Sequence, residues 1–316
     1  MTTPAKPNEL KITRVYDAPA RLVWDAWTDP AQTAQWWGPR GFTLTTHSKD
    51  LRPGGHWSYT MHGPDGTDYE SKTLYYEVEE CAKLVYDHGG NDDRPPLFRV
   101  TVLFHEKDGK TTMDMTMALA TAEAAEETRK FIKKAGGNAT WDRLAEYLEK
   151  AESGKEKFVI NRTFAAPRDI VFAMWTDPAH LAQWLPPQGF KMEFRKADIR
   201  PGGRAFYLMT NGPVTMYGGT EYLEIQAPER VVYTQRFCDE HEATTRHPMS
   251  PSWPETMLTT IDFAEEGPDV TRVTVTWEPH NATAEEIATF VQARGGMTVG
   301  WTGSFDKLEE FLAARK

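Results

Sequence analysis

The residues best suited to chemistry lie between positions 238 and 255. Cys238, His241 and His247 have the thiol and imidazole groups that bind zinc, but their spacing does not match a zinc finger. We expect solvated loop residues and no metal. His247 and Glu255 could act as acid and base on either side of a proline-rich loop. We favour a loop that rims a cavity, because binding residues often lie on loops.

Paired aspartates are a second group of candidates. Asp50 and Asp198 each precede Arg-Pro-Gly-Gly, where a carboxylate could be catalytic or could cap the turn by accepting backbone N–H groups. The turn-capping role is favoured. Asp29 and Asp177 each precede a proline, which is typical of a helix end. No glycine-rich phosphate loop, nucleophile elbow or HExxH motif is found in the sequence.

These paired residues belong to an internal duplication. Equivalent residues in the first part of each copy are separated by the same 148 positions (19 to 167, 30 to 178, 55 to 203). A period this long is far above that of a solenoid repeat, so each copy is a whole domain. We predict one domain at 1–150, a linker at 151–157 and a second domain at 158–316.

Each copy has the same predicted order of elements. A short strand (Lys11–Tyr16, Phe158–Phe164) precedes two short helices, and alternating apolar residues then predict further strands. A helical pattern ends each copy and includes Gly-Gly pairs at 136 and 295, which we expect to kink or break the helix. The fold class is therefore α+β: a curved antiparallel sheet of about six strands, with two short helices and one long C-terminal helix over its concave face.

Aromatic residues make up 12% of the chain and include 11 tryptophans, which suggests a cavity lined by rings. For any single residue, core packing is favoured over ligand contact. The candidate ligand-binding residues are Trp184, Tyr207, Met209, Met216, Tyr233, Trp277 and Trp301 in copy two, and Trp37, Trp57, Tyr59, Met61, Tyr86 and Trp141 in copy one.

The chain resembles a known family in both copies. The resemblance rests on Ala18 to Pro39 and Asp50 to Gly55, which are matched by Ala166 to Pro187 and Asp198 to Gly203, and on Gly300-Trp301-Thr302-Gly303. With these motifs the chain resembles the START-like (SRPBCC) superfamily, in the branch named after the C-terminal domain of the Hsp90 ATPase activator. The resemblance implies a helix-grip fold around a hydrophobic cavity, and members of the family serve many functions.

The two copies diverge in the parts that should bound the cavity. Copy two has about eleven extra residues near Cys238–Trp253 and five more after Gly295-Gly296, as the changing offsets show (126 to 285, 141 to 305). We therefore expect copy two to keep the working pocket. Copy one is expected to be more structural, with a cavity that is smaller or is closed by Trp57 and Trp141.

Composition excludes several classes of partner. The net charge is −10 and no Lys/Arg run exceeds two residues, so we expect no nucleic acid. No segment is apolar enough to predict membrane insertion. Cys81 and Cys238 do not match in the repeat and suggest reduced thiols in a cytoplasmic protein.

The predicted function is therefore the binding of a small hydrophobic or amphipathic molecule, without a cofactor. A cyclase- or hydrolase-type enzyme that uses the same cavity is one alternative. A protein-interaction or chaperone-assisting module is another alternative. The sequence leaves open whether the chain has a protein partner.

Overall fold

A computed structural model describes residues 6–134, 139–153 and 157–315. Contacts divide the chain into unit 1 (Met1–Glu152) and unit 2 (Ser153–Lys316), and each unit is described by itself. The division falls inside the segment predicted as a linker, and the last helix of unit 1 extends to Ser153. Residues 154–156 of that predicted linker lie outside the described residues.

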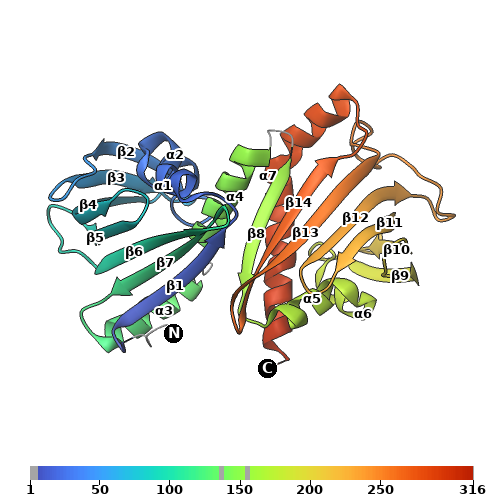
Figure 1. The fold of residues 1–316 in the computed structure, drawn as a ribbon. Coiled ribbons are helices and arrows are strands. Elements are labelled where there is room, and N and C mark those ends of the chain that lie inside the picture. Colours follow the sequence, from blue (N-terminus) through green and yellow to red (C-terminus); the bar gives the residue numbers. More distant parts are fainter. Residues whose placement is uncertain (1–5, 135–138, 154–156, 316) are drawn as a thin grey trace. The chain divides into compact units, whose positions relative to one another are not determined.

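Unit 1 has one strand, two short helices, a run of further strands and then helices, in the predicted order (Figure 1). Its elements are β1 (Glu9–Tyr16), α1 (Ala20–Thr28), α2 (Pro30–Trp36), β2 (Thr43–Lys49), β3 (His56–His62), β4 (Asp68–Glu79), β5 (Lys83–Gly90), β6 (Phe98–Lys107), β7 (Lys110–Ala118), α3 (Ala122–Lys134) and α4 (Ala139–Ser153).

Unit 2 repeats this order with one continuous helix at its end. Its elements are β8 (Phe158–Phe164), α5 (Arg168–Thr176), α6 (Pro178–Trp184), β9 (Lys191–Ala197), β10 (Arg204–Thr210), β11 (Thr215–Gln226), β12 (Arg230–Cys238), β13 (Thr256–Gly267), β14 (Val270–Pro279) and α7 (Ala284–Ala313).

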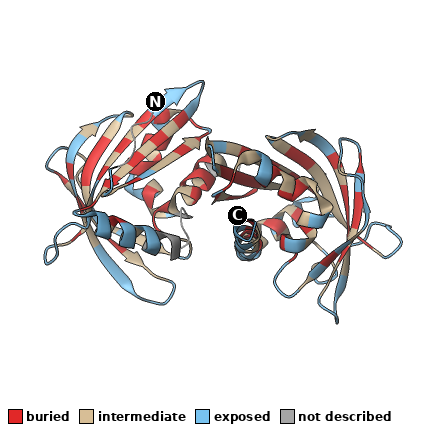
Figure 2. Cartoon of the chain, turned by 90° about the horizontal axis from the view of Figure 1, so that it is seen from below, coloured by how far each residue is buried: buried red, intermediate tan, exposed pale blue. Residues whose placement is uncertain are grey.

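Each sheet has seven antiparallel strands. The order is β1-β7-β6-β5-β4-β3-β2 in unit 1 and β8-β14-β13-β12-β11-β10-β9 in unit 2. The opening strand of each unit pairs with the last strand, which adds one strand to the predicted six. Buried residues lie along the strands and on the helix sides turned toward them (Figure 2). The α+β helix-grip fold predicted from the sequence is confirmed in both units.

The paired short helices begin and end as the sequence predicts. Asp29 is the N-cap of α2, and its carboxylate accepts the N–H groups of Ala31 and Gln32 at 2.8 and 3.0 Å. Asp177 accepts the N–H of Ala179 at 2.8 Å in α6. These carboxylates satisfy helix N–H groups that have no partner within the helix.

The last helix of unit 2 runs without interruption from Ala284 to Ala313. A capping box between Thr283 and Glu286 opens α7, which stays helical through Gly295 and Gly296 and changes direction in its upper part in Figure 1. The predicted break at this pair is therefore wrong, whereas a bend is present. The glycine pair at 136 lies outside the described residues.

The Arg-Pro-Gly-Gly turns require glycine at their last position. A Cβ atom on Gly55 would lie 2.2 Å from the carbonyl oxygen of Asp50, and one on Gly203 would lie 2.1 Å from that of Asp198. The aspartates do not cap these turns with their side chains, contrary to our expectation. Each carboxylate instead pairs with the arginine two residues later, at 2.8 Å to Arg52 and 2.9 Å to Arg200.

Substitution of either buried turn glycine should destabilise its unit. We expect Gly55→Ala and Gly203→Ala to lower the free energy of unfolding by at least about 2 kcal/mol, because the backbone must move away from the new methyl group. Urea unfolding followed by circular dichroism measures this. Gly296→Ala, in open space on a helix, is the control and should stabilise by about 0.5–1 kcal/mol. Equal effects in all three variants would contradict the steric argument.

Candidate functional site

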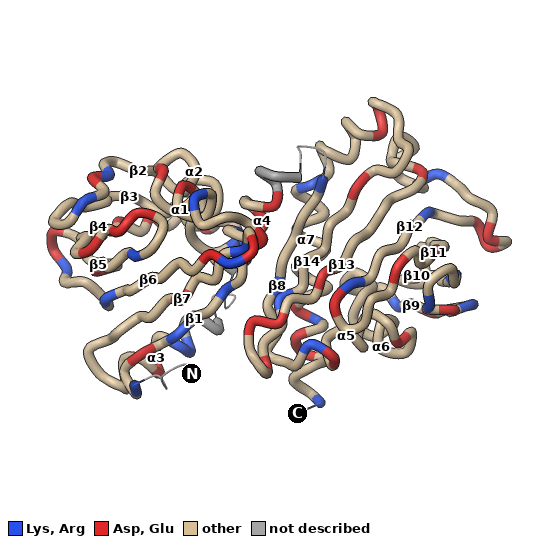
Figure 3. The backbone as a smooth tube through the Cα atoms, viewed as in Figure 1, with Lys and Arg blue, Asp and Glu red and all other residues tan. Residues whose placement is uncertain are grey.

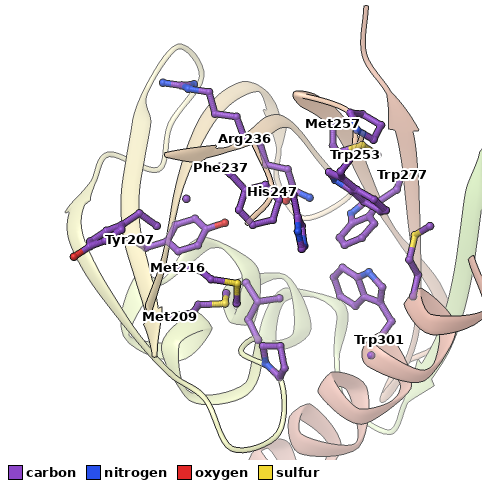
Figure 4. Close-up of a pocket in the computed structure, with 18 of the residues that line it drawn as sticks. Tyr207, Met209, Met216, Arg236, Phe237, His247, Trp253, Met257, Trp277 and Trp301 are labelled. Carbon is purple, nitrogen blue, oxygen red and sulfur yellow. The ribbon is translucent and has the colours of Figure 1, made fainter. Parts of the chain in front are cut away.

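Unit 2 contains a pocket of about 370 Å³ between its sheet and α7 (Figure 4). Strands β10 to β14, the α6–β9 connection, α7 and the loop between β12 and β13 all contribute to its wall. The lining residues are Leu185, Pro187, Tyr207, Met209, Met216, Tyr217, Gly218, Tyr233, Gln235, Arg236, Phe237, His247, Met249, Trp253, Pro254, Glu255, Met257, Trp277, Met297, Gly300, Trp301 and Ser304.

The structure brings six of the seven residues proposed for copy two into this wall. They are Tyr207, Met209, Met216, Tyr233, Trp277 and Trp301. Trp184 is not among the lining residues. It is completely buried, and its indole N–H donates to the carbonyl of Met174 at 3.0 Å. The end of α6 therefore uses this ring for core packing against Trp175.

Sequence reasoning missed several residues of the wall. Phe237 follows Tyr233 and Gln235 at steps of two residues along β12, so all three side chains lie on the same face of the strand. Strand alternation could therefore have predicted Phe237 as a pocket residue. Trp253 and Met249 lie in the segment that copy one lacks, and no periodic pattern marks their direction.

The loop after β12 forms one side of the pocket. It is held by Arg246, which pairs with Glu286 in the first turn of α7 and lies 3.5 Å from Glu255. The rings of His247 and Phe237 meet edge to face with centroids 4.7 Å apart, and Trp253 packs on Phe290 at 5.7 Å. The interpretation of this loop as a rim is consistent with these contacts.

The predicted loop residues occupy three different environments. His241 is 81% exposed, Cys238 is buried at the end of β12, and His247 is half-buried in the pocket wall. Only His241 is therefore a solvated loop residue, as we expected of all three. Within the described ranges, no group of three His, Cys, Asp or Glu side chains could hold a metal ion.

Burial favours the neutral forms of three titratable side chains that line the pocket. Burial lowers the pKa of His247, whose Nδ1 accepts the backbone N–H of Met249 at 3.1 Å. Burial raises the pKa of Tyr207 to about 12 and raises that of Tyr233 further. Each shift has the same cause, because a low-polarity environment disfavours the charged form. The rings of His247, Tyr207 and Tyr233 are thus uncharged at neutral pH.

A glycine on the neighbouring strand allows Tyr207 to lie flat against the sheet. Gly218 pairs with Tyr207 across β10 and β11, and a Cβ atom there would lie 2.4 Å from Cζ of the tyrosine ring. Any larger residue at this position would push the ring into the pocket. The shape of the pocket therefore depends on this glycine as well as on the large side chains.

In unit 1 the candidate residues contact one another. Trp57 stacks on Tyr59 with centroids 4.1 Å apart, and Trp37 meets Trp57 edge to face at 5.2 Å. Trp141 stacks on Trp27 at 5.2 Å and meets Trp37 at 6.2 Å. Tyr86 is also buried and Met61 packs against the same core.

The repeat shows what replaces these rings in unit 2. Trp57 pairs with Thr73 on the next strand, as Ala205 pairs with Thr220. By the constant offset, Leu185 takes the position of Trp37. Two indole rings of unit 1 are thus replaced by much smaller side chains in unit 2, which leaves space between sheet and helix.

The fold and this pocket define a helix-grip protein of the START-like class. The chain matches the family described as Activator of Hsp90 ATPase homolog 1-like protein over residues 17–149 and again over 165–313. It belongs to this family, and the resemblance noted from the sequence is confirmed in both units.

Solved structures similar to the chain include single-unit and two-unit proteins. A protein from Nitrosomonas europaea is 21% identical over 48% of this chain and 100% of its own, with a TM-score of 0.43. One from Mycobacterium smegmatis is 28% identical over 46% of this chain and 94% of its own, with a TM-score of 0.42. The di-domain ARO/CYC BexL from the BE-7585A biosynthetic pathway is 14% identical over 96% of this chain and 97% of its own, with a TM-score of 0.40. None of the curated protein sequences compared with the chain matches it.

Tyr86 pairs with Tyr75 as Tyr233 pairs with Tyr222, so His88, two residues after Tyr86, occupies the position of Gln235 in the pocket of unit 2. Its ring stacks on Phe98 at 5.1 Å and lies 6.2 Å from Trp37, and burial lowers its pKa to about 4. Between pH 6.5 and 4 the unfolded chain therefore binds a proton that the folded unit does not, so stability falls as the pH falls through this window.

His88→Gln should flatten this acid loss of stability. Below pH 6.5 the histidine lowers the free energy of unfolding by up to about 1.4 kcal/mol for each pH unit. Glutamine does not titrate and so has no such effect. Urea unfolding at pH 7, 6 and 5 measures the slope. His105→Gln, at an exposed position, is the control. An unchanged slope in His88→Gln would show that the buried imidazole does not titrate in this window.

Proposed function

We infer that unit 2 binds one small, largely apolar and uncharged molecule in the pocket between its sheet and α7. The observation that carries this proposal is the pocket itself, whose volume of about 370 Å³ falls in the range of small-molecule sites. Its wall combines tryptophan and tyrosine rings with the methionines Met209, Met216, Met257 and Met297. Methionine adapts to irregular apolar shapes and packs well on rings.

We assign a supporting role to unit 1. The corresponding space contains Trp37, Trp57 and Trp141, whose rings contact one another directly. A ligand would have to displace these contacts before it could enter. The duplicated chain then has one binding unit and one unit whose core is filled by its own side chains.

Binding rather than turnover is the function that the polar groups of the pocket favour. The hydroxyl of Ser304 donates to the carbonyl of Leu185 at 3.0 Å, and Glu255 lies 3.5 Å from Arg246. Neither group is therefore set against His247 as an acid–base pair would require. We propose a carrier or sensor of the ligand.

Surface charge supports the proposal of a small-molecule partner over a nucleic acid. Lys and Arg are interspersed with Asp and Glu along the strands and helices (Figure 3). A nucleic-acid site would gather the basic residues into a stripe. None of the helices in the described parts of the chain is long and apolar enough to cross a membrane.

A side chain added at Gly300 should block the pocket. Gly300 lines the pocket, and apart from its chain neighbours and the adjacent backbone of α7 no atom lies within 4 Å of the position its Cβ would take. We expect Gly300→Leu to raise the dissociation constant of the neutral apolar dye N-phenyl-1-naphthylamine at least tenfold, or about 1.4 kcal/mol. Dye fluorescence in a titration of the full chain measures it.

Gly303→Leu provides the matched control on the same helix. Gly303 is exposed and does not line the pocket, and a Cβ atom added to it would also have no other atom within 4 Å. In Gly303→Leu the dissociation constant of the dye should change less than twofold. Both leucine substitutions should stabilise α7 by up to about 1 kcal/mol. Equal affinity in both variants, or two dye molecules bound per chain, would contradict the assignment of the site to unit 2.

A further inference from the structure

A glutamine lies among the rings and methionines of the pocket. Gln235 is on β12 between Tyr233 and Phe237, and all three of these alternate residues line the cavity. Its carboxamide forms no hydrogen bond with any described residue, yet neither its oxygen nor its nitrogen is among the buried atoms that lack a partner. Both atoms are therefore open to the space that the residue lines.

Unit 1 covers the equivalent position with rings. His88 stacks on Phe98 at 5.1 Å, and an indole ring lies 6.2 Å from the imidazole. In unit 2, Met257 pairs with Gln235 as Phe98 pairs with His88, and that indole is one of the two replaced by smaller side chains. The change that opens the pocket therefore also uncovers a carboxamide in its wall.

Other polar side chains of the wall are engaged within the protein. Glu255 lies 3.5 Å from Arg246, and the hydroxyl of Ser304 donates to a backbone carbonyl at 3.0 Å. The Nδ1 atom of His247 accepts a backbone N–H at 3.1 Å. Among the described residues that line the pocket, Gln235 is the one carboxamide, and it offers N–H donors and a carbonyl acceptor side by side.

An uncharged partner suits this group. The guanidinium of Arg236 points away from the cavity in Figure 4, so a buried anion would gain no counter-charge there. A planar carboxamide can instead form two hydrogen bonds at once with a group that has an N–H beside a C=O on the same side. A site with such a polar group rejects molecules that leave it unpaired, because the lost hydration is not replaced.

We propose that the ligand of unit 2 is an uncharged, largely apolar molecule that carries a cis amide, as in a lactam, and that this amide pairs with the carboxamide of Gln235. The N–H of the ligand donates to Oε1, and its carbonyl oxygen accepts from Nε2–H. The apolar part of the ligand lies against the rings and methionines of the wall. This inference rests on the proposed function, since it specifies the chemistry of the molecule held in the same pocket.

A matched pair of probes isolates the amide N–H. Quinolin-2(1H)-one and coumarin have the same two fused rings and differ in having N–H or an oxygen atom beside the carbonyl. Each is titrated into the full chain as a competitor of N-phenyl-1-naphthylamine. The native chain should bind the lactam at least fivefold more tightly, or by about 1 kcal/mol. A pocket without a partner for the N–H should prefer coumarin, because burial of an unpaired N–H is costly.

Substitution of Gln235 assigns the preference to its carboxamide. In Gln235→Met, which keeps a side chain of similar length, the ratio of the two affinities should fall at least fivefold, and Gln235→Leu should behave in the same way. Tyr207→Phe is the matched control, because it removes a hydroxyl from another side chain that lines the pocket. It should change the ratio less than twofold. Loss of the preference in Tyr207→Phe but not in the two Gln235 variants would overturn the assignment.

The two proposals fail in different ways. If the dye does not bind and neither bicyclic compound binds, the proposed function is wrong. If the dye binds but neither compound displaces it, or if the native chain shows no preference for the lactam, the amide proposal is overturned while binding in unit 2 stands. A preference that survives unchanged in both Gln235 variants has the same meaning.

Discussion

The interaction on which each unit depends is the packing of its last helix against the sheet. Specific polar contacts fix this helix to the segment after the second short helix. In unit 1, Arg143 donates to the carbonyls of Gly38 and Pro39 at 2.9 and 2.8 Å. In unit 2, Lys307 at the equivalent position donates to the carbonyl of Pro186 at 2.6 Å. Because these contacts hold the helix in place, side-chain size alone decides whether the space beneath it is filled.

The two units use this shared framework in opposite ways. In unit 1, Trp57 packs on Trp37 and Tyr59, and such packed rings contribute strongly to stability. Unit 2 gives up part of that packing, because Ala205 and Leu185 stand where unit 1 has indole rings. Loss of core volume costs stability unless another molecule restores the contacts. A ligand in unit 2 would therefore complete its core, and binding and folding would be thermodynamically linked.

The sequence predicted the fold and much of the pocket because both follow from local rules. Alternation along β10 placed Tyr207 and Met209 on one face, and the duplication showed the elements of the first part of each copy twice at a constant offset of 148. Trp184 was misplaced as a pocket residue because helix periodicity shows that a side chain is buried but not which neighbour buries it. The direction of Trp253 could not be predicted, since the path of its loop depends on the ion pairs of Arg246.

The glycines of α7 have a consequence for how quickly the pocket exchanges its contents. Gly295, Gly296, Gly300 and Gly303 lie within the helical segment that includes the wall residues Met297 and Trp301. Each glycine weakens a helix by about 1 kcal/mol relative to alanine, so this stretch is locally the least stable part of the helix. Transient unwinding there would open the wall without any movement of the sheet. The residence time of a bound molecule would then follow the opening rate of the helix more closely than the strength of the contacts inside.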